Sequence, residues 1–166
     1  DAADGSYECD LVFVGEYKRY NNPEARDNNI LRVVGNANHI MGSDPTRRFV
    51  FGMTVEYTDT RLWFFSRSHV FVTEKVDLQE DAKLLVHLIV ALGRADLSEL
   101  GFDLTVDRAR AKGGPQIRYR FKIGGNTYET TETLSDYKAK FLLGRAGRIY
   151  KVRLVDQNGS ASGVEY

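Results

Sequence analysis

The sequence predicts an α+β fold, with a mixed or antiparallel sheet and two packed helices, followed by a β-rich appendage. Two observations lead to this prediction. Short apolar runs typical of strands alternate with two helical patterns in the first part of the chain, and a period-2 pattern dominates the rest. With 166 residues, 42% of them hydrophobic and 28% charged, the chain has a globular composition and the length of one domain with an appendage.

The first element should be a buried strand at residues 11–18, because the apolar run there is too short for a helix and rich in β-favouring side chains. Asn22 and Pro23 then predict a helix start, with a capping side chain followed by proline at the first helical position. Apolar residues recur at helical spacing until Gly42: Ile30, Leu31, Val33, Val34, Ala37, Ile40 and Met41. We therefore expect an amphipathic helix after the first strand.

Three further strands should form a meander, since the apolar runs at 49–55, 62–65 and 70–74 are separated by polar residues. Asp77 and Glu80 have the spacing of a capping box and predict a second helix after them. Its apolar positions are Leu84, Leu85, Leu88, Ile89 and Leu92, with Gly93 as the stop signal.

The composition changes after Phe102. We predict an α+β domain at 1–104, a basic loop with glycine and proline at 105–116, and a β-rich segment at 117–166. In that segment apolar side chains alternate with Arg118, Arg120 and Lys122, which should form a solvent-exposed row, and Gly124-Gly125 should turn the strand into a hairpin. A last strand pair should flank the glycine turn at 144–147.

Charge and composition exclude several classes of protein. Lysine plus arginine and aspartate plus glutamate number 23 each, so no overall basic field would hold a polyanion. No apolar run approaches a membrane span, and the single Cys9 excludes an internal disulfide. We expect no membrane contact and an intracellular location, in the cytoplasm or nucleus. Since the chain begins at Asp1, we also expect an excised domain or a processed product.

Five motifs in a shared order resemble the fungal-type protein kinase family over nearly the whole chain. They are Val14-Gly15-Glu16-Tyr17-Lys18, Arg47-Arg48-Phe49-Val50-Phe51-Gly52, Arg61-Leu62-Trp63-Phe64-Phe65-Ser66-Arg67-Ser68, Leu100-Gly101-Phe102-Asp103 and Leu143-Gly144-Arg145. The resemblance implies a leading module with a PD-(D/E)XK-like E-x-K strand in a restriction-endonuclease-like core, followed by the start of a kinase-like small lobe. It also implies relatives among Crinkler-type effectors, and with them secretion into a host cell as an alternative location for this chain.

Glu16 and Lys18 form the E-x-K pair. Residues two apart on a strand share a face and lie roughly 6.6 Å apart, so the carboxylate could bind Mg²⁺ while the ammonium steadies developing charge. Asp10 is the candidate second acid and metal ligand, but on a continuous strand it lies about 20 Å from Glu16, too far to share one ion. Three hypotheses stay open: a solvated strand end, a degenerate nuclease site and a working nuclease.

A second candidate site is the glycine turn, where Gly144, Arg145 and Gly147 could cover nucleotide phosphates as a kinase glycine loop does. A plain hairpin turn is the alternative. The chain contains no H-R-D, D-F-G or V-A-I-K sequence, so it is not a complete kinase.

Basic residues concentrate in the loop and on the strand after it, and are candidates for phosphate or acidic-partner contact: Arg108, Arg110, Arg118, Arg120 and Lys122. We predict a catalysis-poor recognition module that binds a partner protein. In one form of this hypothesis the module is a pathogen effector. The alternatives are a Mg²⁺-dependent nuclease or nucleic-acid-binding domain, and a nucleotide-binding pseudokinase fragment. No cofactor is required except Mg²⁺ for the nuclease.

Overall fold

The computed structural model describes residues 10–110, 117–136, 142–144, 147–155 and 161–165. The chain divides into two compact units. Unit 1 comprises Asp1–Phe102 with Ala139–Arg145, and unit 2 comprises Asp103–Lys138 with Ala146–Tyr166. The chain therefore leaves unit 1, returns to it with a short segment, and then completes unit 2.

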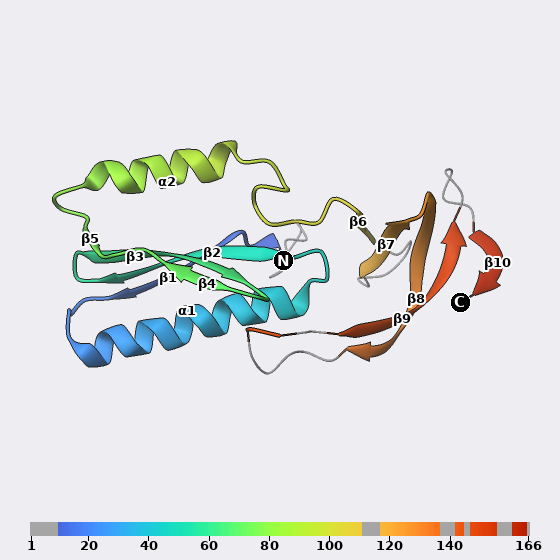
Figure 1. Ribbon diagram of the computed structural model, residues 1–166, viewed down its shortest axis with the longest axis horizontal. Helices are drawn as coiled ribbons and strands as arrows, with labels where there is room; N and C mark the ends of the chain where they lie inside the picture. Colours follow the sequence, from blue (N-terminus) through green and yellow to red (C-terminus); the bar gives the residue numbers. More distant parts are fainter. Residues whose placement is uncertain (1–9, 111–116, 137–141, 145–146, 156–160, 166) are drawn as a thin grey trace, which may run out of the picture. The chain divides into compact units, whose positions relative to one another are not determined.

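Unit 1 contains a sheet in the order β1-β2-β3-β4, with β5 paired to the other end of β3 (Figure 1). The strands are β1 (Phe13–Lys18), β2 (Phe49–Glu56), β3 (Asp59–Ser66), β4 (Val70–Val72) and β5 (Val76–Asp77). β1 is parallel to β2, because a helix returns the chain between them, and the other pairings are antiparallel. The α+β class and the meander are confirmed, whereas a restriction-endonuclease-like core is not.

Helix α1 (Pro23–Ser43) begins as the sequence predicted. The Asn22 side chain accepts a 2.8 Å hydrogen bond from the Ala25 N–H, and Pro23 occupies the first helical position. The buried side of α1 packs on one face of the sheet, and this is the core of unit 1: Val14, Val33, Ala37, Ile40, Met41, Val50, Trp63, Phe65 and Leu142.

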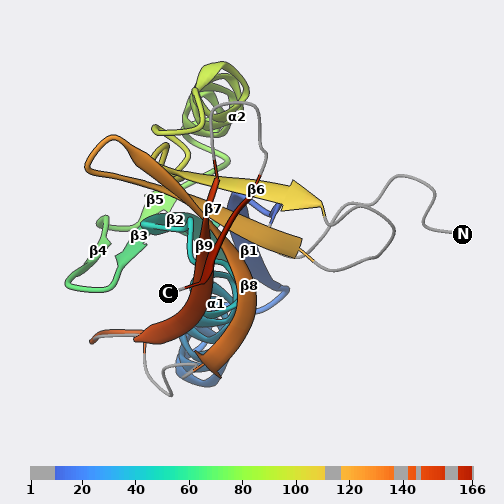
Figure 2. The same cartoon turned by 90° about the vertical axis from the view of Figure 1, so that its right-hand side faces the viewer.

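Helix α2 (Ala82–Arg94) lies over the opposite face of the sheet from α1 (Figures 1 and 2). It begins later than the capping-box spacing predicted. Asp77 instead stabilises a preceding turn, where its carboxylate accepts from the Gln79 N–H at 2.8 Å and its carbonyl accepts from the Asp81 N–H at 2.9 Å. No residue of α2 is buried.

Unit 2 contains an antiparallel sheet in the order β10-β9-β8-β7-β6 (Figure 1). The strands are β6 (Val106–Arg110), β7 (Ile117–Ile123), β8 (Asn126–Asp136), β9 (Arg148–Val155) and β10 (Ala161–Glu165). The predicted β7–β8 hairpin is confirmed. Gly124 and Gly125 have φ angles of 57° and 82°, the left-handed values of a two-residue type I′ turn.

The structure differs from the sequence-based predictions at two places in this second half. Val106–Arg110, expected as loop, forms β6, because it pairs with β7 and places Val106 opposite Phe121. Leu142–Gly144, expected to end a strand, form a bend, and β9 pairs with β8 instead. Lys140, Phe141 and Arg145 lie outside the described residues.

Candidate functional site

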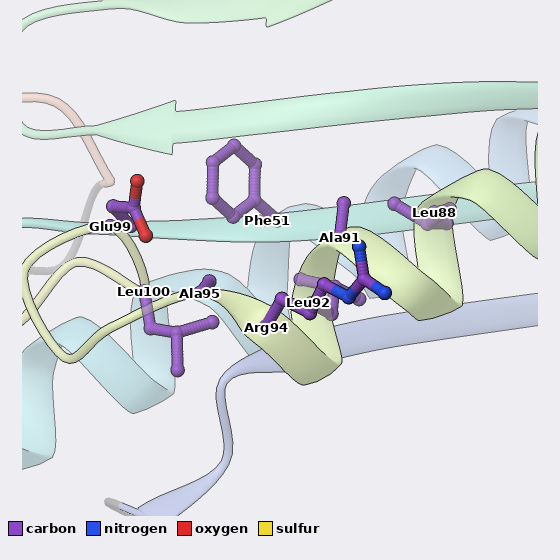
Figure 3. Close-up of a pocket in the computed structure, with 8 residues that line it drawn as sticks. All are labelled: Phe51, Leu88, Ala91, Leu92, Arg94, Ala95, Glu99 and Leu100. Atoms are coloured by element: carbon purple, nitrogen blue, oxygen red, sulfur yellow. The ribbon is translucent and has the colours of Figure 1, made fainter.

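An apolar cavity of about 490 Å³ lies between α2 and the sheet of unit 1. Figure 3 shows its lining: Phe51 comes from β2, Leu88, Ala91, Leu92 and Arg94 from α2, and Ala95, Glu99 and Leu100 from the segment after α2. Small and aliphatic side chains of the helix thus face an aromatic ring of the sheet across an open space.

A second cavity of about 300 Å³ adjoins the first, and both are lined by Phe51 and Leu88. Its floor is largely aromatic and includes Phe13, Phe64 and Phe71. The rings of Phe51 and Phe64 lie 5.7 Å apart and those of Phe64 and Phe71 lie 6.0 Å apart, so they form a continuous aromatic surface. We call the two cavities together the α2 groove.

The outer side of α2 is apolar as well. Val86, Ile89 and Val90 are 58%, 61% and 44% exposed, although they lie on a helix whose other apolar side chains face the sheet. A helix that is apolar over most of its circumference is normally buried. α2 therefore presents more apolar surface to solvent than its place in unit 1 explains.

The polar residues of α2 form one stripe along the helix. Lys83, His87 and Arg94 are spaced i, i+4 and i+11, which places them on the same side. α2 contains no acidic residue. Of this stripe, Arg94 lines the first cavity, together with the acidic Glu99 of the segment after α2.

Glu16 and Lys18 lie on β1, at the edge of the sheet, and their side chains share the face that carries Val14 and packs toward α1. Asn36 of α1 donates a 2.7 Å hydrogen bond to Glu16 Oε1. In the register Lys18 lies opposite the buried Glu56 of β2. The predicted pair therefore lies on one face of β1, and the acid of the pair contacts the Asn36 amide.

Asp10 precedes β1 and is exposed. In the part of the chain that the structure describes, no three His, Cys, Asp or Glu side chains converge as a metal site would require. The metal role predicted for Glu16 and Asp10 remains a prediction.

Gly144 has a φ of 116° and lines a cavity of about 630 Å³ with Arg48, Arg67 and His69 among others. Its N–H, however, donates a 2.9 Å hydrogen bond to the Arg67 carbonyl, so it is not directed at a ligand. Gly147 belongs to unit 2, whereas Gly144 belongs to unit 1. Nucleotide binding by the two glycines stays a prediction, to which this geometry adds no support.

Arg118, Arg120 and Lys122 lie on one face of β7, as the alternation predicted. They do not form a simple solvated row, because Arg118 and Arg120 contact the buried Glu129 and Lys122 contacts Asp107 at 2.9 Å. Sequence alternation could not show this, since the partner carboxylate comes from the next strand. Arg108 points to the other face of the sheet by strand alternation, and the side chain of Arg110 is not described.

The α2 groove was not among the sequence-based site predictions, because helical spacing indicated an ordinary core helix. A signal was present in the apolar runs Leu84-Leu85-Val86 and Leu88-Ile89-Val90-Ala91-Leu92, which cover most of the circumference of a helix. Only the tertiary structure shows that neither side of this helix becomes buried.

The fold and the α2 groove define an α+β protein with an open apolar surface. A sequence model of the family described as fungal protein kinase matches residues 2–164, and the chain belongs to this family. Neither the curated proteins nor the solved structures contain a significant match. Among the described residues, neither helix has the length and apolarity to cross a membrane.

Proposed function

We propose that this chain is a catalysis-poor recognition module of the fungal protein kinase family that binds a partner protein at the α2 groove. The observation that carries the proposal is that α2 is apolar over most of its circumference, buries no residue, and stands over an aromatic sheet face. Covering a large apolar side chain contributes about 1.5–3 kcal/mol. A partner that fills the groove would gain this for each side chain it covers.

The groove favours an amphipathic helical segment. Its apolar lining would accept anchors spaced i, i+3 or i+4, and i+7 on one side of a helix, as in other helix-in-groove complexes. The stripe of Lys83, His87 and Arg94 would attract acidic residues flanking those anchors, and this charge complementarity would set the orientation. We therefore identify the partner chemistry as apolar anchors with acidic flanks.

The test measures binding of a fluorescent amphipathic peptide by anisotropy. One peptide carries leucine anchors with glutamate flanks, and a second carries the same anchors with lysine flanks. The glutamate peptide should bind more tightly, and L88D should weaken it by more than about tenfold, because Leu88 lines both cavities. L31D is the matched control, since Leu31 is an exposed leucine of α1, on the other side of the sheet.

Charge reversal separates electrostatic from apolar recognition. The double variant K83E/R94E should reverse the preference between the two peptides, while R32E on α1 should leave it unchanged. Equal binding of both peptides to the native chain, or equal binding of the glutamate peptide to the native chain and L88D, would contradict the proposal.

A further inference from the structure

Three arginines converge on one carboxylate in unit 2. Arg120 on β7 and Arg153 on β9 lie directly opposite Glu129 on the central strand β8, one on each side, and Arg118 lies on β7 two residues before Arg120. Arg120 reaches Oε2 at 2.8 Å, Arg118 reaches Oε1 at 3.3 Å, and Arg153 also donates to Oε1. We call these four residues the arginine cluster.

The cluster carries an excess of positive charge. Three guanidinium groups and one carboxylate sum to a net charge of +2, and the carboxylate of Glu129 is held among them at only 4% exposure. A carboxylate has about four acceptor positions, whereas each guanidinium has five donors. Most donors of the cluster are therefore not used on Glu129.

Part of this donor capacity faces outward. The side chains of Arg118, Arg120 and Arg153 are 35%, 37% and 32% exposed. An anion at the surface of the cluster would find guanidinium edges already held in place by Glu129.

We propose that the arginine cluster is a binding site for a phosphate monoester. A monoester carries about −1.5 to −2 charges at neutral pH and three strong acceptor oxygens, which match the net charge and the planar donors of the arginines. A carboxylate ligand would leave one positive charge uncompensated. The site is separate from the α2 groove and does not depend on the function proposed there.

A polynucleotide fits the surroundings less well. Binding of a nucleic-acid backbone needs a track of cations that meets successive phosphates. Next to the cluster on the same face, the charge of Lys122 is offset by Asp107 at 2.9 Å. This pair interrupts the row of cations along β7, which favours a single dianionic group over a series of phosphates.

The test titrates the full chain at constant ionic strength with inorganic phosphate, with a phosphoserine peptide and its unphosphorylated form, and with a single-stranded DNA oligonucleotide. Calorimetry and the thermal unfolding midpoint are the measurements. If only the phosphopeptide binds, the ligand is a phosphorylated side chain of a protein. If inorganic phosphate binds as well, the phosphate group alone is sufficient for recognition. Both outcomes support the proposal. Tighter binding of the oligonucleotide than of the phosphopeptide would overturn it.

Variants assign the binding to the cluster. R153Q leaves Glu129 paired with two arginines, so the fold should survive while phosphate affinity falls by about tenfold or more. K122Q removes one positive charge from the same face of the sheet and should have little effect on phosphate affinity. If R153Q does not fold, R118Q removes the longest of the three contacts and takes its place. Identical phosphate affinities for the native chain and the arginine variant would contradict the proposal.

Discussion

The Asn36 amide of α1 holds the carboxylate of Glu16 on β1 through a 2.7 Å hydrogen bond to Oε1. The helix that follows the E-x-K strand thus supplies a neutral donor to its acidic residue. A two-carboxylate nuclease would instead need a second acid at this position to share a metal ion.

We therefore expect no Mg²⁺- or Mn²⁺-dependent cleavage of DNA or RNA. In gel assays the native chain, E16Q and K18A should show the same background level of nucleic-acid cleavage. Cleavage by the native chain that falls more than about 10²-fold in both variants would establish a working nuclease instead.

A buried ion pair should stabilise unit 1. Arg61 Nη1 lies 3.0 Å from Glu56 Oε2, and Asn29 donates to Glu56 Oε1 at 2.8 Å, while Glu56 is 1% exposed. R61A should lower the free energy of unfolding by about 3–5 kcal/mol, because it leaves a buried carboxylate without its cation.

The matched control is K75A, which removes the cation of the exposed Lys75–Asp59 pair at 2.9 Å. That change should cost at most about 1 kcal/mol. Denaturant titration of both variants gives the two changes in the free energy of unfolding. Equal changes would show that the Glu56 pair stabilises the fold no more than the exposed pair does.

Glu129 should make unit 2 sensitive to acid. Burial by itself raises the pKa of Glu129, but hydrogen bonds from Arg153 and Arg120 outweigh it and bring the pKa below the usual value of 4.5. Because the pKa is lower in the folded chain, the ionised carboxylate stabilises the fold above about pH 4.5, and this contribution is lost as the pH falls through the folded-state pKa.

Hydrogen exchange of β8 amides against pH measures this effect. Protection in the native chain should fall below pH 4.5, whereas E129Q should show weaker protection near neutral pH and a flatter acid response. An unchanged acid response in E129Q would place the titrating group elsewhere.

Leu142 should contribute to the stability of unit 1 although it lies far along the chain. It is 5% exposed within the core cluster, and its carbonyl accepts a 3.1 Å hydrogen bond from Arg67 Nη1. L142A should lower the free energy of unfolding by about 2–5 kcal/mol, because it leaves a cavity in the core.

The adjacent L143A provides the control, since Leu143 is 52% exposed and its loss should cost less than about 0.5 kcal/mol. Thermal and denaturant unfolding distinguish the two variants. Similar unfolding of L142A and the native chain would mean that the returning segment does not support the core.

Local sequence signals predicted the elements whose chemistry is contained within a few residues. Asn22-Pro23 predicted the start of α1, and Gly124-Gly125 predicted the β7–β8 turn, because capping and positive φ depend on the residues themselves. The E-x-K strand was likewise confirmed as β1, since a short apolar run is a strong strand signal.

Only the tertiary structure decided which surfaces are covered and which charges meet. Glu129 lies on a different strand from each of its arginines, so alternation along β7 placed them on one face without revealing their partner. The apolar pattern of α2 predicted a helix but not its incomplete burial, because burial depends on how closely the sheet and helix approach. β6 is a strand for the same reason: its pairing with β7 overrides a polar local sequence.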